Sequence, residues 1–408
     1  MRRRVLFFVI LSLLTVNTFA EYSDFYYDWA RFFYPSMDDN AGMTLFPSLF
    51  IPLGGKNEGM GTAFTAVAND ISFIESNPAG SSLLPKTELA FLHHSWIMDS
   101  NLEGVTYVTR LDDLGLAAAG KFLYVPFNEK DGWGRAGGKG YYLELIATLN
   151  ASYNLFKSYY FNGLSVGANV KVAYMGVPES VYADQSYLTV MADVGVLTRF
   201  NLLKFYNADD KNFSIGATFR NVSPLPSDDP LPTLASFGLA YSPLRPLLLA
   251  VDFNLPVSFN PNIPAEKYYF AAGFTLAFSP FLSLQGGVKL KSSNPMVTLG
   301  ATLDLDTVTF MVNYNLDLSS TMDPLDKFSL SAKFNLGDMG RSTKQQEIEK
   351  LYLTGIELYS NDRLEEAIAT WEKVLELDPE HTPARHYLQV ARDALNLKKE
   401  IQGTSLLE

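Results

Sequence analysis

Apolar and polar residues alternate along most of the chain, from about residue 86 to residue 336. A period of two residues is typical of β-strands that have one apolar and one polar face. In the final run, one face carries Phe328, Leu330, Ala332, Phe334 and Leu336, and the other carries Lys327, Ser329, Ser331, Lys333 and Asn335. Comparable runs cover 142–153, 164–174, 187–198, 213–220, 268–278, 282–290, 297–305 and 308–316. Turn-forming clusters separate the runs, so the pattern predicts about fourteen strands of roughly ten residues each.

Strands of this length suit a membrane barrel. A tilted strand needs about 9–11 residues to cross a bilayer, and a sheet in lipid must close because its backbone amides need partners. No segment offers the roughly 20 uninterrupted apolar residues of a membrane helix. We therefore expect residues 86–337 to form an all-β transmembrane barrel of about 14 antiparallel strands, with the apolar face toward lipid and the small or polar face toward the lumen. A soluble β-sandwich, which shows the same alternation, is the alternative.

The N-terminus has the features of a secretory signal. Arg2, Arg3 and Arg4 precede an apolar run, Val5–Leu14, and a small-residue cleavage site ends at Ala20. This order predicts a signal peptide at 1–20; the alternative, a membrane-anchor helix, has too short an apolar core. Residues 21–85 do not alternate cleanly and are expected to precede the barrel. Export, an even strand number and clusters of Tyr and Phe near strand ends favour an outer-membrane barrel over a sandwich.

After residue 337 the apolar period changes from strand-like to helical. We expect a linker at 338–346, a helical module at 347–399 and a tail at 400–408. Two helices are expected at Glu347–Leu358 and Asp362–Leu377, and a third from about 383 to 399. Gly355, Ala367, Trp371 and Pro379 have the spacing of a tetratricopeptide repeat, which the module resembles: small residues let two helices approach, Trp371 fills the space between them and Pro379 ends the unit.

Composition excludes several classes of function. The net charge is −12 and the pI is near 4.9, so the basic footprint of a nucleic-acid-binding protein is absent and no nucleic-acid partner is expected. The absence of cysteine excludes disulfides, a thiol nucleophile and a Cys-based zinc site. Of the four histidines, His93 and His94 are adjacent on one strand and must point to opposite faces, and His381 and His386 lie far along the chain. We predict no metal site, no cofactor and no enzymatic activity.

The stretch from Glu58 to Gly80, EGMGTAFTAVANDISFIESNPAG, resembles the N-terminal motif of the FadL/PorV superfamily of outer-membrane barrels, and its spirochaetal members in particular. In that superfamily the motif marks a segment that plugs a fourteen-stranded barrel. The resemblance therefore implies an all-β barrel with a plug within residues 21–85. The motif residues it assigns to the plug are Gly59, Gly61, Asn77, Pro78, Ala79 and Gly80.

The resemblance implies two different functions. FadL-type barrels bind long-chain fatty acids or other hydrophobic molecules and release them sideways through an opening in the wall. PorV-type barrels are outer-membrane partners of a secretion and attachment machinery. Our first hypothesis is uptake of hydrophobic small molecules through the outer membrane, whose lipid surrounds the barrel. The alternative is a non-transporting scaffold that docks an envelope or secretion complex through a periplasmic module at 347–399.

The third expected strand, Leu114–Phe127, is a candidate for a wall opening. It contains Gly115, Gly120, three consecutive alanines and Pro126. Proline cannot donate to the strand ladder, so this strand is either kinked or, as the simpler alternative, an ordinary strand with a row of small side chains.

Overall fold

The computed structural model describes residues 28, 31, 38, 40, 42, 44–96, 100–130, 133–178, 186–207, 210–223, 230–260, 262–292, 295–318 and 326–405. The predicted signal peptide (1–20), most of residues 21–43 and the last part of the predicted tail lie outside the described residues.

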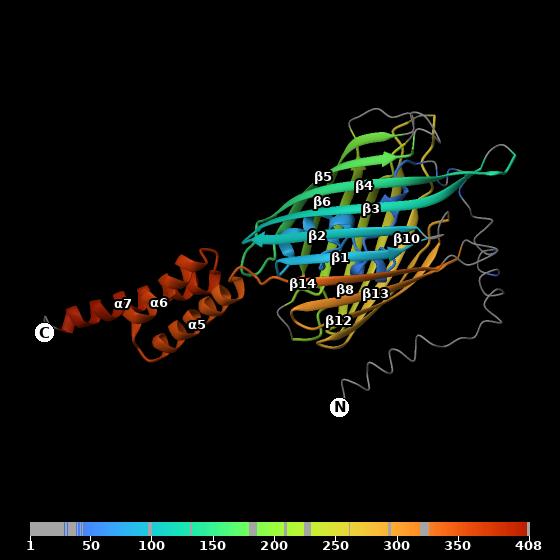
Figure 1. Ribbon diagram of the computed structural model, residues 1–408. Coiled ribbons are helices and arrows are strands. Elements are labelled where there is room, and N and C mark those ends of the chain that lie inside the picture. Colours follow the sequence, from blue (N-terminus) through green and yellow to red (C-terminus); the bar gives the residue numbers. More distant parts are fainter. Residues whose placement is uncertain are drawn as a thin grey trace.

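Fourteen antiparallel strands close into one barrel in which each strand pairs with its neighbours in the chain and the first pairs with the last (Figure 1). They are β1 Glu88–Ser95, β2 Asn101–Leu111, β3 Leu114–Lys130, β4 Ala136–Leu155, β5 Leu164–Gly176, β6 Tyr187–Phe200, β7 Phe213–Val222, β8 Thr233–Leu244, β9 Leu247–Val257, β10 Tyr269–Ser279, β11 Leu282–Lys289, β12 Met296–Asp304, β13 Val308–Asp317 and β14 Lys327–Asn335. The closed ring confirms the predicted barrel of about fourteen strands, and the sandwich alternative is wrong.

The barrel wall has apolar side chains on its outer face and polar side chains on its inner face, the reverse of the arrangement in a soluble protein. On β5, Val170 and Val172 point outward and are exposed, whereas Asn169 and Lys171 point inward and are buried. The same arrangement recurs on β13, where Phe310 is exposed and the polar positions between the apolar ones face the interior. Alternation in the sequence therefore corresponds to an apolar outer surface and a polar lumen.

Between Leu114 and Tyr124, the described part of β3 pairs with strands on both sides and shows no opening. The ladder between β3 and β4 runs without interruption past Pro126, which lies opposite Tyr141, and the register shifts only between Asn128 and Lys130. β3 also pairs with β2 from Leu114 to Tyr124. The row of small residues in β3 therefore belongs to an ordinary strand.

The two ends of the barrel differ. At the end where the chain leaves β14, several strands are joined by two-residue turns: 112–113, 245–246 and 280–281. At the opposite end, longer connections occur at 177–186, 223–232 and 258–268. We call these the helix end and the loop end. Outer-membrane barrels have short turns on one side and long loops on the other. Here the two-residue turns lie at the helix end, but that end also has longer connections at 156–163 and 201–212.

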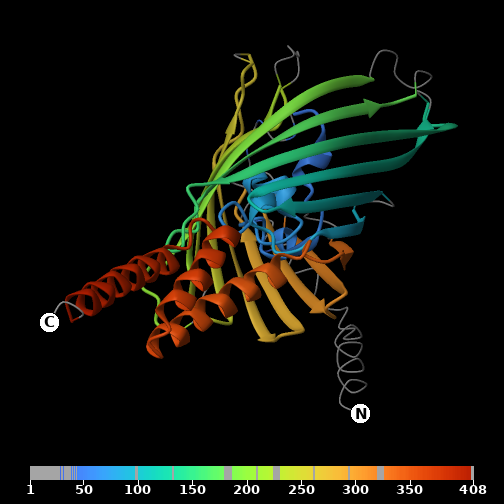
Figure 2. The ribbon, with the colours of Figure 1, turned by 90° about the vertical axis from the view of Figure 1, so that its left-hand side faces the viewer.

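Residues 44–84, which we call the inner segment, lie inside the barrel (Figures 1 and 2, blue). They form four short helices: η2 Pro47–Phe50, α3 Gly55–Gly59, α4 Phe73–Ser76 and η3 Pro78–Leu83. Phe46, Phe64 and Phe73 are completely buried. Three apolar clusters join the inner segment to the wall. One lies against β1–β3 through Leu92, Leu102 and Val108, one against β8–β10 through Ala240, Ala250 and Ala271, and one against β4–β6, where Phe46 packs on Ile146, Ala173 and Met191.

Glycines on the inner face of the wall allow the backbone of the inner segment to approach the strands. A Cβ atom on Gly167 would collide with the carbonyl group of Pro78, and a Cβ atom on Gly287 would collide with the backbone of Met60. Glycines on five further strands have the same role: Gly115, Gly195, Gly216, Gly238 and Gly273. Any side chain at these positions would occupy space that the inner segment fills. Glycine at these positions is therefore needed for the inner segment to pack against the wall.

Three helices follow the barrel: α5 Arg341–Ser360, α6 Leu364–Leu377 and α7 Thr382–Ser405. α5 begins six residues before the helix expected at Glu347, within the range assigned to the linker. Residues 341–346 are polar but favour helix, so the helix extends beyond its apolar pattern. Among the described residues, no helix is long and apolar enough to cross a membrane, which says nothing about a β-barrel.

The helices form one compact module attached to the helix end. Trp371 is completely buried, its indole lies against Gly355, and Ala367 is buried beside it. Pro379 follows the last residues of α6, and its carbonyl accepts a hydrogen bond from Arg385. Arg341 donates hydrogen bonds to the carbonyls of Arg110 and Pro85 at the barrel rim.

Candidate functional site

The predicted motif residues all lie in the inner segment. Asn77 caps η3, accepting a hydrogen bond from the Ala79 amide at 3.1 Å. Its amide group donates to the carbonyls of Thr65 at 2.7 Å and Val196 at 3.0 Å. The carbonyl of Pro78 accepts from Asn150, and that of Ala79 accepts from Ser165. Gly80 packs against the ring of Phe73.

Gly59 and Gly61, near the start of the motif, contact β11 and β12, which are not the strands that bind Asn77–Gly80. Gly61 has a φ angle of +63°, which favours glycine, and a Cβ there would meet the backbone of Gly287. The carbonyl of Gly59 accepts a hydrogen bond from Thr298 at 3.0 Å. The motif therefore brings its two ends, around Gly59 and around Asn77, to different strands.

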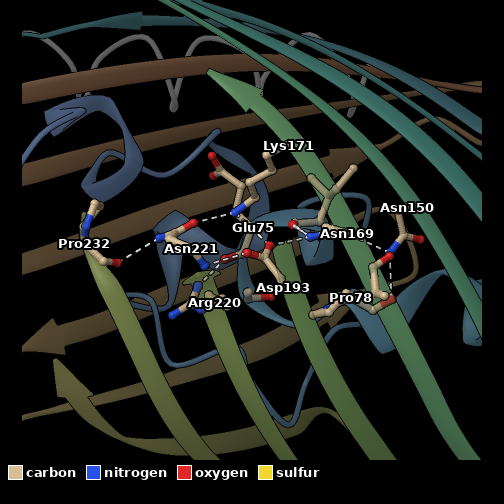
Figure 3. A network of polar contacts seen from close by, with 12 residues as sticks. Glu75, Pro78, Asn150, Asn169, Lys171, Asp193, Arg220, Asn221 and Pro232 are labelled. Atoms are coloured by element: carbon tan, nitrogen blue, oxygen red, sulfur yellow. Dashed lines mark hydrogen bonds and ion pairs between the residues drawn. The ribbon is translucent and has the colours of Figure 1, made fainter. Parts of the chain in front are cut away.

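A polar network from β5, β6 and β7 lies against one side of the inner segment (Figure 3). Lys171 on β5 lies 2.7 Å from the Asp193 carboxylate on β6, and donates to Asn221 on β7 at 2.7 Å. Asn169 donates to Asp193 at 2.7 Å and to the carbonyl of Ile74 at 2.9 Å. These residues lie on the polar faces that alternation predicts, but the network itself could not be predicted from the sequence, because only strand register brings its members together.

The inner segment fills the helix end of the lumen and leaves a cavity toward the loop end. The cavity has a volume of about 260 Å³ and lies beside residues 42–52, with β1 and β11–β14 on its wall side. Its lining combines apolar Phe50, Trp96 and Met296 with polar His94, Asn315, Lys289, Lys291 and Lys327. A second cavity of about 80 Å³ shares Phe50, Pro52, Lys289 and Lys291 with it and extends toward Lys121 and Lys171.

Three polar side chains that line the larger cavity have bonding capacity left over. Lys289 is 4% exposed; no direct hydrogen bond or ion pair of its amine is seen among the described residues, and Glu266 interacts with it electrostatically. Neither ring nitrogen of His94 has a hydrogen-bond partner in the described part of the chain, and the Asn315 side-chain oxygen has none either. Buried polar groups are nearly always paired, so these three are satisfied by whatever fills the cavity, whether water or a ligand.

The cavity walls are cationic although the whole chain is acidic. Six basic side chains line the two cavities: Lys121, Lys171, Arg220, Lys289, Lys291 and Lys327. Among the described lining residues, two are carboxylates: Glu75, 2.6 Å from Lys121, and Glu266, 2.6 Å from Lys291. Lys171 is in turn paired with Asp193, which does not line either cavity. Along the lining itself basic groups outnumber acids, and this favours an anion. Lys289 could have been identified as a candidate site residue from the sequence, because it is a lysine on the predicted inward face of a strand with few charged residues.

Glu58 lies below the cavity, between the inner segment and the wall. Its carboxylate accepts hydrogen bonds from Asn315 and, at 2.6 Å, from Ser329, and lies 3.6 Å from Nδ1 of His94. Burial raises the pKa of the Glu58 carboxyl to about 7, although these hydrogen bonds oppose the shift.

The described residues contain no cluster of three or more His, Asp or Glu side chains that could hold a metal. His93 is half exposed on the outer face and His94 is buried inside, so the two point to opposite sides of β1, as predicted.

Residues 34–338 match the sequence family described as an uncharacterised protein family, UPF0164. This chain belongs to the UPF0164 family. The matched range ends at the start of the helical module, so α5–α7 lie outside it. A UPF0164 protein of Treponema pallidum (strain Nichols) is 27% identical over 384 residues, covering 90% of this chain and 87% of the relative. A second UPF0164 protein of that organism is 25% identical over 397 residues, with 88% and 78% covered.

The UPF0164 barrel is also similar in shape to outer-membrane barrels of known structure. The TodX deltaS2S3 mutant monoaromatic hydrocarbon channel is 13% identical, with a TM-score of 0.45 over 68% of this chain and 98% of that chain. The Acinetobacter baumannii outer membrane protein Omp33 is 10% identical, with a TM-score of 0.37 over 62% and 98%.

Proposed function

We propose that this UPF0164 protein is an outer-membrane barrel that takes up hydrophobic small molecules with an anionic end, such as long-chain fatty acids. One observation carries the proposal: a single cavity combines the unpartnered amine of Lys289 with the apolar side chains of Phe50, Trp96 and Met296. The apolar outer face of the wall and the resemblance to FadL-type barrels support the membrane location and the type of ligand.

The chemistry of the cavity matches an amphipathic anion. A carboxylate beside Lys289 would supply the partner that this buried amine lacks, and charge-assisted hydrogen bonds are the strong ones. An alkyl chain against Phe50, Trp96 and Met296 would gain about 25 cal/mol for each Å² of apolar surface removed from water. A neutral hydrocarbon would gain the free energy of burying apolar surface, but not the hydrogen bond to Lys289.

The inner segment has the position of a plug in this proposal. Between the cavity and the helix end, residues from Met60 to Leu84 are mostly buried against the wall. Uptake through the barrel therefore requires the inner segment to rearrange. The motif residues that anchor it, Gly59, Gly61 and Asn77–Gly80, would hold the closed state.

The ligand class is tested by binding measurements on the purified barrel in detergent, using oleate and its neutral counterpart oleyl alcohol. Lys289→Met should weaken oleate binding about 10- to 100-fold, the loss of one charge-assisted hydrogen bond of about 1.5–3 kcal/mol. It should leave the alcohol unaffected. The matched control is Lys139→Met, since Lys139 is exposed on the loop-end extension of β4. Equal affinity of wild type and Lys289→Met for oleate would contradict the proposal.

A scaffold role for the helical module is the second candidate. α7 continues past the other two helices (Figure 1), and its Leu397 and Ile401 are about 60% exposed. These apolar side chains on a charged surface favour a protein partner in the periplasm, where the helix end would lie if the long loops face outward. Deleting residues 341–408 separates the candidates: oleate uptake should survive under the transport proposal, whereas co-purifying envelope proteins should disappear under the scaffold proposal.

A further inference from the structure

Five basic side chains line the smaller cavity, the one of about 80 Å³: Lys121, Lys171, Arg220, Lys289 and Lys291. They come from β3, β5, β7 and β11 or from just after it, so the barrel brings them together from distant parts of the chain. Figure 3 shows Lys171 and Arg220 together with Glu75, the carboxylate on this lining. The smaller cavity therefore has more basic groups on its lining than the larger one.

Three of these basic groups are paired directly with carboxylates, and two are not. The pairs, at 2.6–2.7 Å, are Lys121–Glu75, Lys171–Asp193 and Lys291–Glu266. Among the described residues, no ion pair is seen for Lys289 or Arg220. Their electrostatic interactions with carboxylates, Glu266 for Lys289 and Asp252 for Arg220, act at longer range. The smaller cavity therefore has two cationic groups without a direct counter-ion in the described part of the chain.

Hydrogen-bonding capacity is also left over on this lining. Nε of Arg220 and Oδ1 of Asn57 have no hydrogen-bond partner among the described residues, although both atoms are buried. The other nitrogens of the Arg220 guanidinium donate to the carbonyl of Glu75 and to Ser236. Asn57 and Lys289 are each 4% exposed. Whatever fills the smaller cavity therefore meets two cationic donors, Arg220 and Lys289, and one acceptor, the Asn57 oxygen.

A phosphate group matches this set of polar atoms. A phosphomonoester carries about two negative charges near pH 7 and has three strong acceptor oxygens, and guanidinium and ammonium groups are its usual partners. In its singly protonated form it also has a hydroxyl, which would donate to Oδ1 of Asn57. A carboxylate has one charge and no such hydroxyl. One water molecule needs about 10–15 Å³, so about 80 Å³ has room for a group of several oxygen atoms.

We infer that the smaller cavity is a phosphate-binding site, in which Arg220 and Lys289 are the charged donors and Asn57 is the acceptor. Two sources supply this chemistry: inorganic phosphate, and the head of a single-chain lipid whose alkyl chain lies in the larger cavity. Both cavities border Lys289 and Phe50, and Nζ of Lys291 lies 4.1 Å from the centre of the Phe50 ring. The site shares Lys289 with the proposed function but requires no uptake of fatty acids.

The test is isothermal titration calorimetry of the full-length protein in a nonionic detergent, with inorganic phosphate, dodecyl phosphate and dodecanoate. Arg220→Gln should weaken binding of the phosphate ligands at least tenfold and that of dodecanoate less than threefold. The matched control is Arg199→Gln. Arg199 on β6 also donates to a carbonyl of the inner segment, that of Val67 at 2.7 Å, but it does not line the smaller cavity. It should bind all three ligands as wild type does.

The affinities of the two phosphate ligands identify the source. Dodecyl phosphate bound at least tenfold more tightly than inorganic phosphate indicates a lipid head, whereas equal affinities indicate free phosphate. Asn57→Asp covers the case in which Arg220→Gln does not fold. It is nearly isosteric and places a negative charge on the lining, so it should abolish binding of both phosphate ligands.

Three results would overturn the inference: no saturable binding of either phosphate ligand to wild type, unchanged phosphate affinity in Arg220→Gln and Asn57→Asp, or an equal loss of dodecanoate and phosphate binding in Arg220→Gln. The proposed function is tested separately by oleate binding to wild type and Lys289→Met. Oleate binding without phosphate binding would refute only the phosphate site, and phosphate binding without oleate binding would refute only the fatty-acid proposal.

Discussion

The ammonium group of Lys121 on β3 lies 2.6 Å from Oε1 of Glu75 in α4. Lys121 also donates to the carbonyl of Ile51, and Arg220 donates to the carbonyl of Glu75. Lys121 therefore joins Ile51 and α4, two parts of the inner segment, to the wall. Lys121 is buried and Glu75 is largely buried, so removal of either side chain would leave the other charge without its partner in a buried position.

Removing one member of this ion pair should lower the free energy of unfolding more than removing both members. We expect Lys121→Met to lower the free energy of unfolding by about 3–5 kcal/mol, because it leaves a carboxylate without its partner. The double variant with Glu75→Gln should recover most of this loss. Urea unfolding in detergent micelles, followed by tryptophan fluorescence, measures both. Additive effects of the two substitutions would show that the pair is not coupled.

Asn77 and Pro78 should be needed to keep the lumen closed. Replacing both with alanine removes the cap of η3 and two hydrogen bonds to Thr65 and Val196. Proteoliposomes that contain the variant should release a small hydrophilic dye faster than wild type. Asn101→Ala, at an exposed position on β2, is the control. Unchanged release with a correctly folded barrel would mean that this end of the inner segment does not seal the lumen.

The Glu58 carboxyl should make stability depend on pH. In the unfolded chain it ionises near pH 4.5, but in the folded protein it holds its proton until about pH 7. Stability should therefore fall as the pH rises from 4.5 to 7, by about 3 kcal/mol, and stay low above that range. Glu58→Gln lacks this contribution, so its advantage over wild type should grow with pH in urea unfolding. An equal difference at pH 4 and pH 8 would contradict the assignment.

The helical module should depend on the contact between Gly355 and Trp371. Trp371→Ala should destabilise the module by about 3–5 kcal/mol, and Gly355→Ala should also destabilise it because the new methyl group would collide with the indole. Hydrogen exchange of the α5 and α6 amides reports both. Leu353→Ala, at a 55% exposed position of α5, is the control and should leave exchange unchanged.

Much of the barrel could be predicted from alternation alone. Phe328–Leu336 and the runs before it correspond to β14 and its neighbours, because in a closed membrane-type wall every second side chain faces the same medium. The repeat-like spacing of Gly355, Ala367 and Trp371 likewise identified three residues that meet in one core. The start of α5 at Arg341 was missed, since a polar first turn carries no periodic signal.

The sequence by itself determined the strand number, the faces of each strand, and the existence of a separate helical module, because these depend on neighbours a few residues apart. Only the tertiary structure decided that the small residues of β3 are paired on both sides and that Lys289, His94 and Asn315 share a cavity. It also decided that Phe50 lies against Lys291. These relationships join residues from different strands and from the inner segment. They depend on register, on closure of the ring and on how the inner segment packs against wall glycines, none of which leaves a local pattern in the chain.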